Sequence, residues 1–254
     1  MEQLLRATAR AEARHFWFRG FRAFVAPFVR RAAGGRRTLQ ILDCGCGTGA
    51  NLDWLRAFGP AFGFDLSETG LRLGRAAGRT RMARAAVDAA PFPDGSFDLV
   101  TSFDVLYSLP DAIEHAALVE MYRLLRPGGH AVINVAAMES LRGDHSVLSR
   151  EIRRYSRDLL RTRVIAAGFD VERITYAFAS LYAPMWLART WQRRRGLRRE
   201  EEPGAQAEIA VPAAPVNGLL TAVLWIEAAV LRGIDLPFGS SLICLARKPP
   251  APRT

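Results

Sequence analysis

The sequence predicts an α/β fold with helices on both faces of a mostly parallel, doubly wound sheet. Short apolar segments alternate with helical segments as far as residue 135, which is typical of a parallel sheet. The segment 97–103 is largely apolar, as expected for a central strand buried on both faces. A strand at 39–43 leads directly into a turn with glycine at every second position. Such turns lie at the carboxyl ends of strands, where open α/β sheets bind ligands.

The composition excludes several classes of protein. The 254 residues are half apolar and 24% charged, so the chain can bury a full core. Three cysteines do not make a disulfide framework, and the two in the glycine turn lack the further His or Cys ligands of a metal site. The first residues lack the apolar run of a signal peptide, so we expect a cytoplasmic protein. The net charge of +10 comes from dispersed arginines and is not taken as a sign of nucleic acid.

In the first half of the chain, helical periodicity and helix-ending glycines define the predicted elements. Residues 2–33 are predicted to be helical, with the aromatic-rich segment 15–19 inside them. After the glycine turn we expect a helix from about 50 to 58, a strand at 61–65 and a helix that Ser67 caps. A short strand is predicted at 83–87.

In the second half of the chain, predicted helices and strands continue to alternate, and the pattern becomes less regular after the strand at 131–135. A helix should end at 124, followed by a tight turn at 125–129 and a strand at 131–135. Residues 138–151 are predicted as a polar loop, followed by a helix that Ser156 caps and a strand at 169–176. An aromatic-rich helix at 181–191 and an apolar helix at 216–231 precede a closing strand at 240–247. The apolar helix is predicted to be too short to span a bilayer, and Glu227 interrupts it.

The glycine turn and two acids indicate a nucleoside site. Gly45, Gly47 and Gly49 would let backbone N–H groups approach a ligand closely. Asp43 precedes them, and Asp65 ends the second strand, where an acid can accept both ribose hydroxyls. Nicotinamide enzymes space these glycines as Gly-x-Gly-x-x-Gly, so the spacing argues against an oxidoreductase of that kind.

The motif Asp-x-Gly-x-Gly-x-Gly at 43–49 resembles the signature of class I S-adenosylmethionine-dependent methyltransferases. Segments 91–98 and 125–129 are also typical of that family, and the His-aromatic-Trp-Phe-Arg segment at 15–19 resembles its small bacterial members. The resemblance covers residues 39–178 and implies a Rossmann-like fold of seven strands. It supports a cofactor-binding domain at 37–178 with 240–249, preceded by an N-terminal helical lid at 1–36. The segment at 179–239 departs from a minimal methyltransferase and is predicted to be a helical cap inserted before the last strand.

The resemblance implies S-adenosyl-L-methionine as the cofactor and assigns its contacts. Asp43 and the glycine turn would hold the methionine end, Asp65 the ribose, and Asp88 the adenine. The residues expected at the cofactor are Asp43, Gly45, Cys46, Gly47, Gly49, Asn51, Asp65, Leu66, Asp88, Ala89, Phe103, Tyr107, Trp17 and Arg19. No metal is expected, because a sulfonium leaving group is already activated.

The catalytic base is less well defined by the sequence. We expect His145, which lies after the fifth strand on the binding side, with Tyr155 and His15 as the next candidates. Relatives often carry Glu-His directly after the fourth strand, where this chain has Tyr107 and Ser108. A carboxylate acceptor would need no base.

The expected reaction is in-line methyl transfer to oxygen or nitrogen of a small-molecule or lipid-like acceptor. The missing Glu-His leaves an alternative, a non-catalytic S-adenosylmethionine-binding partner or membrane-associated subunit. A nucleic-acid acceptor is not expected, because the Asn/Asp-Pro-Pro-Tyr/Phe motif is missing after the fourth strand. The aromatic residues and arginines of 180–236 suit a cap over the acceptor, a homodimer face or a peripheral membrane contact.

Overall fold

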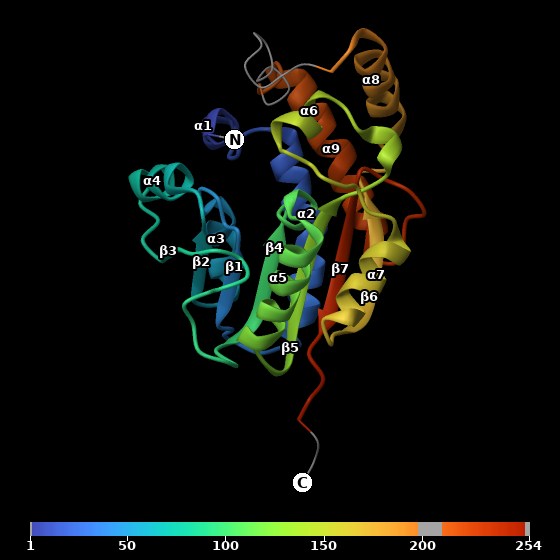
Figure 1. Cartoon of the computed structure of the whole chain (residues 1–254). Helices are drawn as coiled ribbons and strands as arrows, with labels where there is room; N and C mark the ends of the chain where they lie inside the picture. Colours follow the sequence, from blue (N-terminus) through green and yellow to red (C-terminus); the bar gives the residue numbers. More distant parts are fainter. Residues whose placement is uncertain (1, 198–209, 252–254) are drawn as a thin grey trace.

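The computed structural model describes residues 2–197 and 210–251. It contains one seven-stranded sheet in the order β3-β2-β1-β4-β5-β7-β6 (Figure 1). Neighbouring strands are parallel except at β7, which runs antiparallel to both β5 and β6. The predicted doubly wound, mostly parallel sheet of seven strands is therefore confirmed.

The elements have the following bounds. The strands are β1 (Ile41–Cys44), β2 (Ala61–Asp65), β3 (Met82–Arg84), β4 (Phe97–Phe103), β5 (Leu125–Ala136), β6 (Asp170–Ala177) and β7 (Ser241–Arg247). The α-helices are α1 (Glu2–Ala11), α2 (Phe16–Ala33), α3 (Ala50–Leu55), α4 (Glu68–Ala76), α5 (Asp111–Leu124), α6 (Asp144–Leu148), α7 (Arg157–Ala166), α8 (Tyr182–Arg195) and α9 (Ala214–Leu231). Short 3-10 helices are η1 (Arg56–Phe58), η2 (Leu106–Ser108) and η3 (Glu139–Leu141).

The strand order reverses between β1 and β4. From β1 the chain moves outward through β2 to β3, and it then returns to the other side of β1 as β4. Ligands in open α/β sheets bind at such a switch point, outside the carboxyl ends of the strands. The glycine turn after β1 and the loop after β4 therefore meet where the sequence predicts the cofactor.

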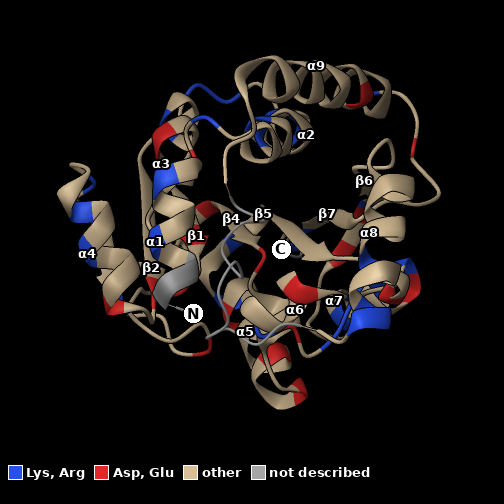
Figure 2. Ribbon diagram, turned by 90° about the horizontal axis from the view of Figure 1, so that it is seen from above, with Lys and Arg blue, Asp and Glu red and all other residues tan. Residues whose placement is uncertain are grey.

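Two apolar layers enclose the sheet. Helices α5 and α7 lie on one side of it, whereas α2 covers the other and α9 lies outside α2 (Figure 2). Phe24 and Phe28 of α2 belong to the same buried cluster as Leu224 and Leu231 of α9. Helix α9 thus completes the core on this face of the sheet.

Several predicted bounds differ from the structure for local reasons. The predicted strand at 83–87 is shortened to β3, because an antiparallel bridge between Ala86 and Ala89 closes a turn there. Strand β5 begins at Leu125, which pairs with Phe97, although this position was expected in a tight turn. The helix expected over 2–33 is interrupted between α1 and α2, where His15 caps the second helix.

The region after β5 is more ordered than predicted. The expected polar loop at 138–151 contains η3 and α6, and it buries Asp144 and Ser146. Helix α9 spans 18 residues, long and apolar enough to cross a membrane by length and composition, which corrects the expectation that it is too short. The part of the predicted cap at 198–209 lies outside the described residues.

Candidate functional site

The glycine turn after β1 combines left-handed backbone with close packing. Gly45, Gly47 and Gly49 have positive φ angles of 77°, 55° and 74°. A Cβ on Gly45 would lie 2.4 Å from a methyl carbon of Val105 in the loop after β4. Both the backbone conformation and the lack of space therefore require glycine at position 45.

The N–H groups of this turn mostly bond within the protein. Those of Gly45 and Cys46 both donate to the Phe64 carbonyl, each at 2.9 Å. The N–H of Gly47 donates to Asp65 Oδ2 at 2.7 Å. These N–H groups are therefore used within the protein in this conformation, and the glycines provide room for a ligand; their close approach to that ligand stays a prediction.

Asp65 ends β2 and holds the glycine turn. Its two carboxylate oxygens accept from the N–H groups of Gly47 and Ser67, each at 2.7 Å. A carboxylate offers about four lone pairs, so Asp65 can still accept the hydroxyls of a ribose. Leu66 follows with 63% of its surface exposed, although it is apolar, as an adenosine contact would require. The ribose role stays a prediction.

Asp43 fits a cationic donor that the protein itself does not supply. Its Oδ1 accepts from the Thr101 hydroxyl at 2.6 Å, whereas Oδ2 is buried without a hydrogen-bonding partner among the described residues. Burial raises the pKa of Asp43 to about 7, although Thr101 and the nearby Asn51 amide lower it. The ammonium group of S-adenosylmethionine would satisfy such a buried oxygen.

Asp88 and Ala89 lie in the turn that follows β3. The bridge between Ala86 and Ala89 closes this turn, and Asp88 is half-buried within it. Strand β3 neighbours β2, so the turn lies beside the tip that carries Asp65. The position agrees with the adenine contact predicted for Asp88, which stays a prediction.

The N-terminal helix α1 covers part of the glycine turn. Glu12, just after α1, is buried and accepts from the Thr48 hydroxyl at 2.7 Å. Arg79 joins them, donating to Glu12 at 3.3 Å and to the Thr48 carbonyl at 3.0 Å. Leu5 lies 3.7 Å from the Cβ position of Gly47. Part of the predicted lid therefore rests on the cofactor side of the sheet, through residues that sequence reasoning missed.

The aromatic segment at 15–19 is used mainly to fix α2. His15 caps the helix, where its Nδ1 accepts from the Trp17 N–H at 3.1 Å, and burial lowers its pKa. Trp17 stacks on Phe178, the residue after β6, with ring centroids 4.0 Å apart. Arg19 lies 5.2 Å above the Trp225 ring of α9. These contacts give the segment a structural role in this conformation.

The loop after β4 carries the residue that sequence reasoning missed most clearly. Asp104 has a φ of 61°, is exposed, and accepts from the Asn134 amide of β5 at 2.8 Å. Desolvation by the surrounding protein and the Glu151 carboxylate raise its pKa to about 7. Phe103 and Tyr107 on either side are buried. The sequence does contain a signal for Asp104, because this acid directly follows the central strand.

The predicted bases differ in their surroundings. His145 is half-buried on α6, and its carbonyl accepts from the Ser149 N–H at 2.9 Å and the Ser149 hydroxyl at 2.7 Å. Tyr155 is fully buried and donates to Glu114 at 2.7 Å, and burial raises its pKa above the ordinary range. The phenol is therefore a structural donor in this conformation, whereas His145 stays a candidate.

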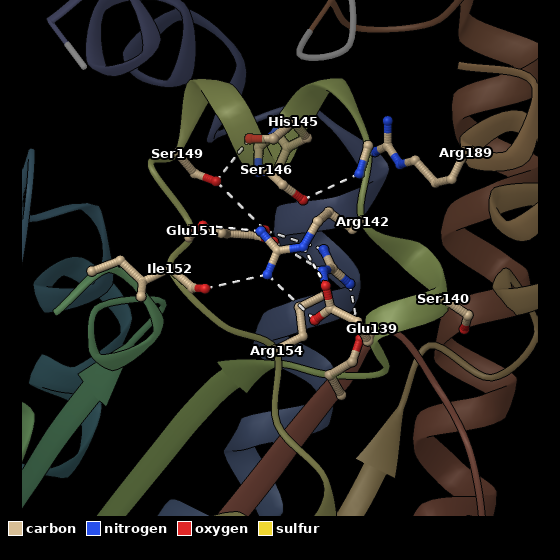
Figure 3. A network of polar contacts seen from close by, with 12 residues as sticks. Glu139, Ser140, Arg142, His145, Ser146, Ser149, Glu151, Ile152, Arg154 and Arg189 are labelled. Atoms are coloured by element: carbon tan, nitrogen blue, oxygen red, sulfur yellow. Dashed lines mark hydrogen bonds and ion pairs between the residues drawn. The ribbon is translucent and has the colours of Figure 1, made fainter. Parts of the chain in front are cut away.

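A polar network fixes the segment between β5 and α7 (Figure 3). Arg154 donates to both carboxylate oxygens of Glu151, at 2.9 and 3.1 Å, and to the Ala137 carbonyl at 2.8 Å. Arg142 joins Glu139 to the Glu151 backbone. Burial would raise the pKa of Glu151, but the charge and hydrogen bond of Arg154 lower it below its ordinary value. The network holds α6 and His145 in place above it.

The described residues contain no cluster of side chains suited to bind a metal ion. Within 2–197 and 210–251, no group of three or more His, Cys, Asp or Glu side chains could hold a metal ion. The three cysteines are free and buried.

Comparison with known proteins identifies the domain. Residues 42–133 match the methyltransferase domain family. A ubiquinone/menaquinone biosynthesis C-methyltransferase of Pseudoalteromonas translucida is 30% identical over 164 residues, or 59% of this chain and 62% of that protein. The corresponding Geobacter sulfurreducens protein is 38% identical over 117 residues, covering 41% of this chain and 43% of its own length. The chain thus matches about half the length of these relatives.

Solved structures share the fold. An S-adenosylmethionine-dependent methyltransferase from Mesorhizobium loti superimposes with a TM-score of 0.54 at 21% identity, covering 88% of this chain and 97% of that one. Residues 42–133 thus match the methyltransferase domain family on a class I, Rossmann-like fold, and this match, with the glycine turn and the acids of β1 and β2, supports S-adenosyl-L-methionine as the cofactor.

Proposed function

We propose that this protein methylates a lipid-like acceptor of the quinol type, a ring made electron-rich by acidic hydroxyl groups. Both curated relatives described above are named as C-methyltransferases of ubiquinone and menaquinone biosynthesis. We therefore favour transfer to a ring carbon over the oxygen or nitrogen acceptors that the sequence suggested. A lipid-like acceptor was already among those expectations.

The observation that carries this proposal is the state of Asp104. A quinol hydroxyl must lose its proton for the ring carbon to become a strong nucleophile, and a base works best when its pKa lies near the operating pH. Asp104 is exposed at the tip of β4, next to the glycine turn, where desolvation by the surrounding protein and the Glu151 carboxylate raise its pKa toward neutrality. The Asn134 amide fixes one carboxylate oxygen at 2.8 Å. We assign the proton acceptor to Asp104.

Aromatic side chains near the strand tips suit a lipid-like ring. Trp17 is half-buried on Phe178 after β6, and Phe21 meets Phe103 of β4 edge to face at 5.0 Å. Phe21, Phe103 and Phe178 are themselves buried in the core, so of these rings the half-buried Trp17 is the one that can offer contact area to an acceptor with an apolar body.

The cofactor, when bound, supplies an electrophilic methyl group on a sulfonium that leaves as a neutral thioether. Asp43 would hold its ammonium group and Asp65 its ribose. The protein's main contribution is alignment of the acceptor carbon with the methyl group, which in well-oriented systems contributes about 7–11 kcal/mol. Asp104 takes the proton that the acceptor hydroxyl loses, and the proton on the newly methylated ring carbon moves to that oxygen as the ring regains aromaticity.

The test is turnover of a reduced, demethylated quinone with a short isoprenoid tail, followed by mass spectrometry. We expect a product heavier by one methyl group on a ring carbon. Asp104→Asn should lower kcat by about 10²–10⁴-fold and abolish its rise as pH increases through 7, because only the deprotonated carboxylate accepts the proton. Methylation of oxygen, or no product with cofactor bound, would contradict the proposal.

A matched control is Asp94→Asn in the turn before β4. The Asp94 side chain is 81% exposed and pairs with Arg123, far from the strand tips. This variant should keep both kcat and the pH profile of the unmodified protein. If both variants lose activity equally, the assignment of Asp104 fails.

A further inference from the structure

The outer face of α9 is an uninterrupted apolar surface. The only charged residue among its 18 is Glu227, which is buried. Leu219 and Ile226 expose 66% and 67% of their surfaces, and Trp225 exposes half. From Val216 onward the exposed side chains follow helical spacing and are Val216, Leu219, Ala222, Trp225, Ile226, Ala229 and Val230. We name this stripe the α9 outer face.

Helix α9 is anchored from its other side. Leu224, Ala228 and Leu231 are buried against α2. The Glu227 carboxylate accepts from the N–H groups of Ala179 and Ser180, at 2.7 and 2.9 Å. A membrane-spanning position would remove Glu227 from these donors and leave a carboxylate in hydrocarbon. The contacts therefore hold α9 parallel to the protein surface with its apolar face outward.

The apolar surface continues beyond α9 toward α8. Ile234 and Phe238, in the segment after α9, are 61% and 42% exposed. Phe238 meets Tyr182, the first residue of α8, with ring centroids 5.4 Å apart. Farther along α8, Leu187 and Trp191 are each 62% exposed.

Arginines line the edge of the α9 outer face. Arg19 lies over the Trp225 ring, and Arg30 and Arg232 line a shallow groove beside the same tryptophan. The one acidic residue of α9 is the buried Glu227. Asp235, just beyond the helix, is paired with Arg173 at 2.7 Å.

We propose that the α9 outer face rests on an anionic lipid bilayer, with its aliphatic side chains at the acyl boundary. An apolar stripe with a tryptophan and a basic edge is the pattern of helices that lie in the membrane interface. The net charge of +10 adds long-range attraction to anionic lipid. A second copy fits less well, because a two-fold interface would bring the basic edge of both copies into one interface, whereas the single acidic residue of α9, Glu227, is buried and cannot pair with it.

This surface goes beyond the proposed function and does not depend on it. It would keep a protein with a lipid-like acceptor at the membrane, yet binding to vesicles can be measured without any acceptor. Failure of turnover and failure of membrane binding are therefore separate results.

The experiment is co-sedimentation of the full chain with phosphatidylcholine vesicles, with and without phosphatidylglycerol. We expect binding that increases with phosphatidylglycerol and weakens with salt. Leu219→Glu with Ile226→Glu should lower the partition coefficient by at least about tenfold, because two large apolar side chains no longer enter the interface. Arg30→Glu with Arg232→Glu should remove the preference for phosphatidylglycerol.

The matched control is Val119→Glu with Ile165→Glu on α5 and α7. These side chains are 43% and 52% exposed and lie on the opposite face of the sheet. The control should bind vesicles like the unmodified protein, and thermal melts should show that both double variants fold. Equal binding by the α9 variant, or equal loss in the control, would overturn the proposal. A vesicle-free dimer that Leu219→Glu with Ile226→Glu dissociates would identify an interface between two copies instead.

Discussion

Two neighbouring strands end in acids whose surroundings differ. Asp65 is partly accessible and accepts two backbone N–H bonds, whereas Asp43 is buried with one oxygen unpaired among the described residues. A carboxyl group that is buried as Asp43 is holds its proton until a cation approaches. The two acids are therefore suited to different parts of one ligand, the ribose and the ammonium group.

Asp65→Ala is expected to weaken the binding of S-adenosylhomocysteine by about a hundredfold, since each hydrogen bond to a charged group contributes about 1.5–3 kcal/mol. It should also lower the melting temperature, because the turn N–H of Gly47 loses its acceptor. Calorimetry and thermal melts measure the two effects. Glu68→Ala, where the side chain is 78% exposed on the next helix, is the control. Unchanged affinity in Asp65→Ala would contradict the ribose assignment.

The raised pKa of Asp43 predicts that the affinity for the cofactor depends on pH. Its pKa is about 7 in the free protein, and a bound ammonium group would lower it. Binding below pH 7 then releases a proton, so affinity should rise with pH up to about 7 and level off above it. Calorimetry in buffers of different ionisation enthalpy counts the released protons. Asp43→Asn should bind more weakly without this pH dependence, and an unchanged slope would refute the assignment.

Among the elements, α2 and α9 make the contact that sequence patterns did not reveal. Gly20 of α2 lies so close to α9 that an added Cβ would be 2.4 Å from Leu224 Cδ1. Periodicity predicts that each helix exists, because it depends on neighbouring residues alone. The pairing depends on residues about two hundred positions apart, including the bond from the Phe16 N–H to Asn217 at 2.8 Å.

Gly20→Ala should destabilise the protein by about 1–3 kcal/mol, because the new methyl group overpacks the α2–α9 contact. Leu224→Ala in the same chain should relieve part of that cost, which a double-mutant cycle by urea unfolding detects. Gly218→Ala is the control, since nothing lies within 4 Å of its Cβ position. That change should be neutral or stabilising by up to about 1 kcal/mol. If the effects of Gly20→Ala and Leu224→Ala on the free energy of unfolding are simply additive, a direct contact between these two positions is excluded.

At the scale of the whole molecule, the predicted cap region contributes to the core of the main domain. Residues 179–239 were expected to cover the acceptor, but α9 buries Leu224, Ala228 and Leu231 on the α2 side of the sheet. A chain lacking residues 180–236 is therefore expected to unfold at much lower urea concentration, with exposed apolar surface that binds a hydrophobic dye. Circular dichroism and dye fluorescence check this. A stable, cooperative core in that deletion would show that α9 is dispensable for the fold.

The sequence by itself determined the sheet, the glycine turn and the acids at the strand tips. Those features are local: strand periodicity, glycine spacing and an acid after a strand each depend on a few consecutive residues. Only the tertiary structure showed that Asp65 accepts a hydrogen bond from the glycine turn, and that Glu12 and Arg79 hold α1 against that turn. The raised pKa of Asp104 also depends on the folded surroundings of its carboxyl group. The tertiary structure also placed α9 on α2 with an apolar face outward. Hydrogen bonds, burial and charge between distant segments exist only once the chain has folded.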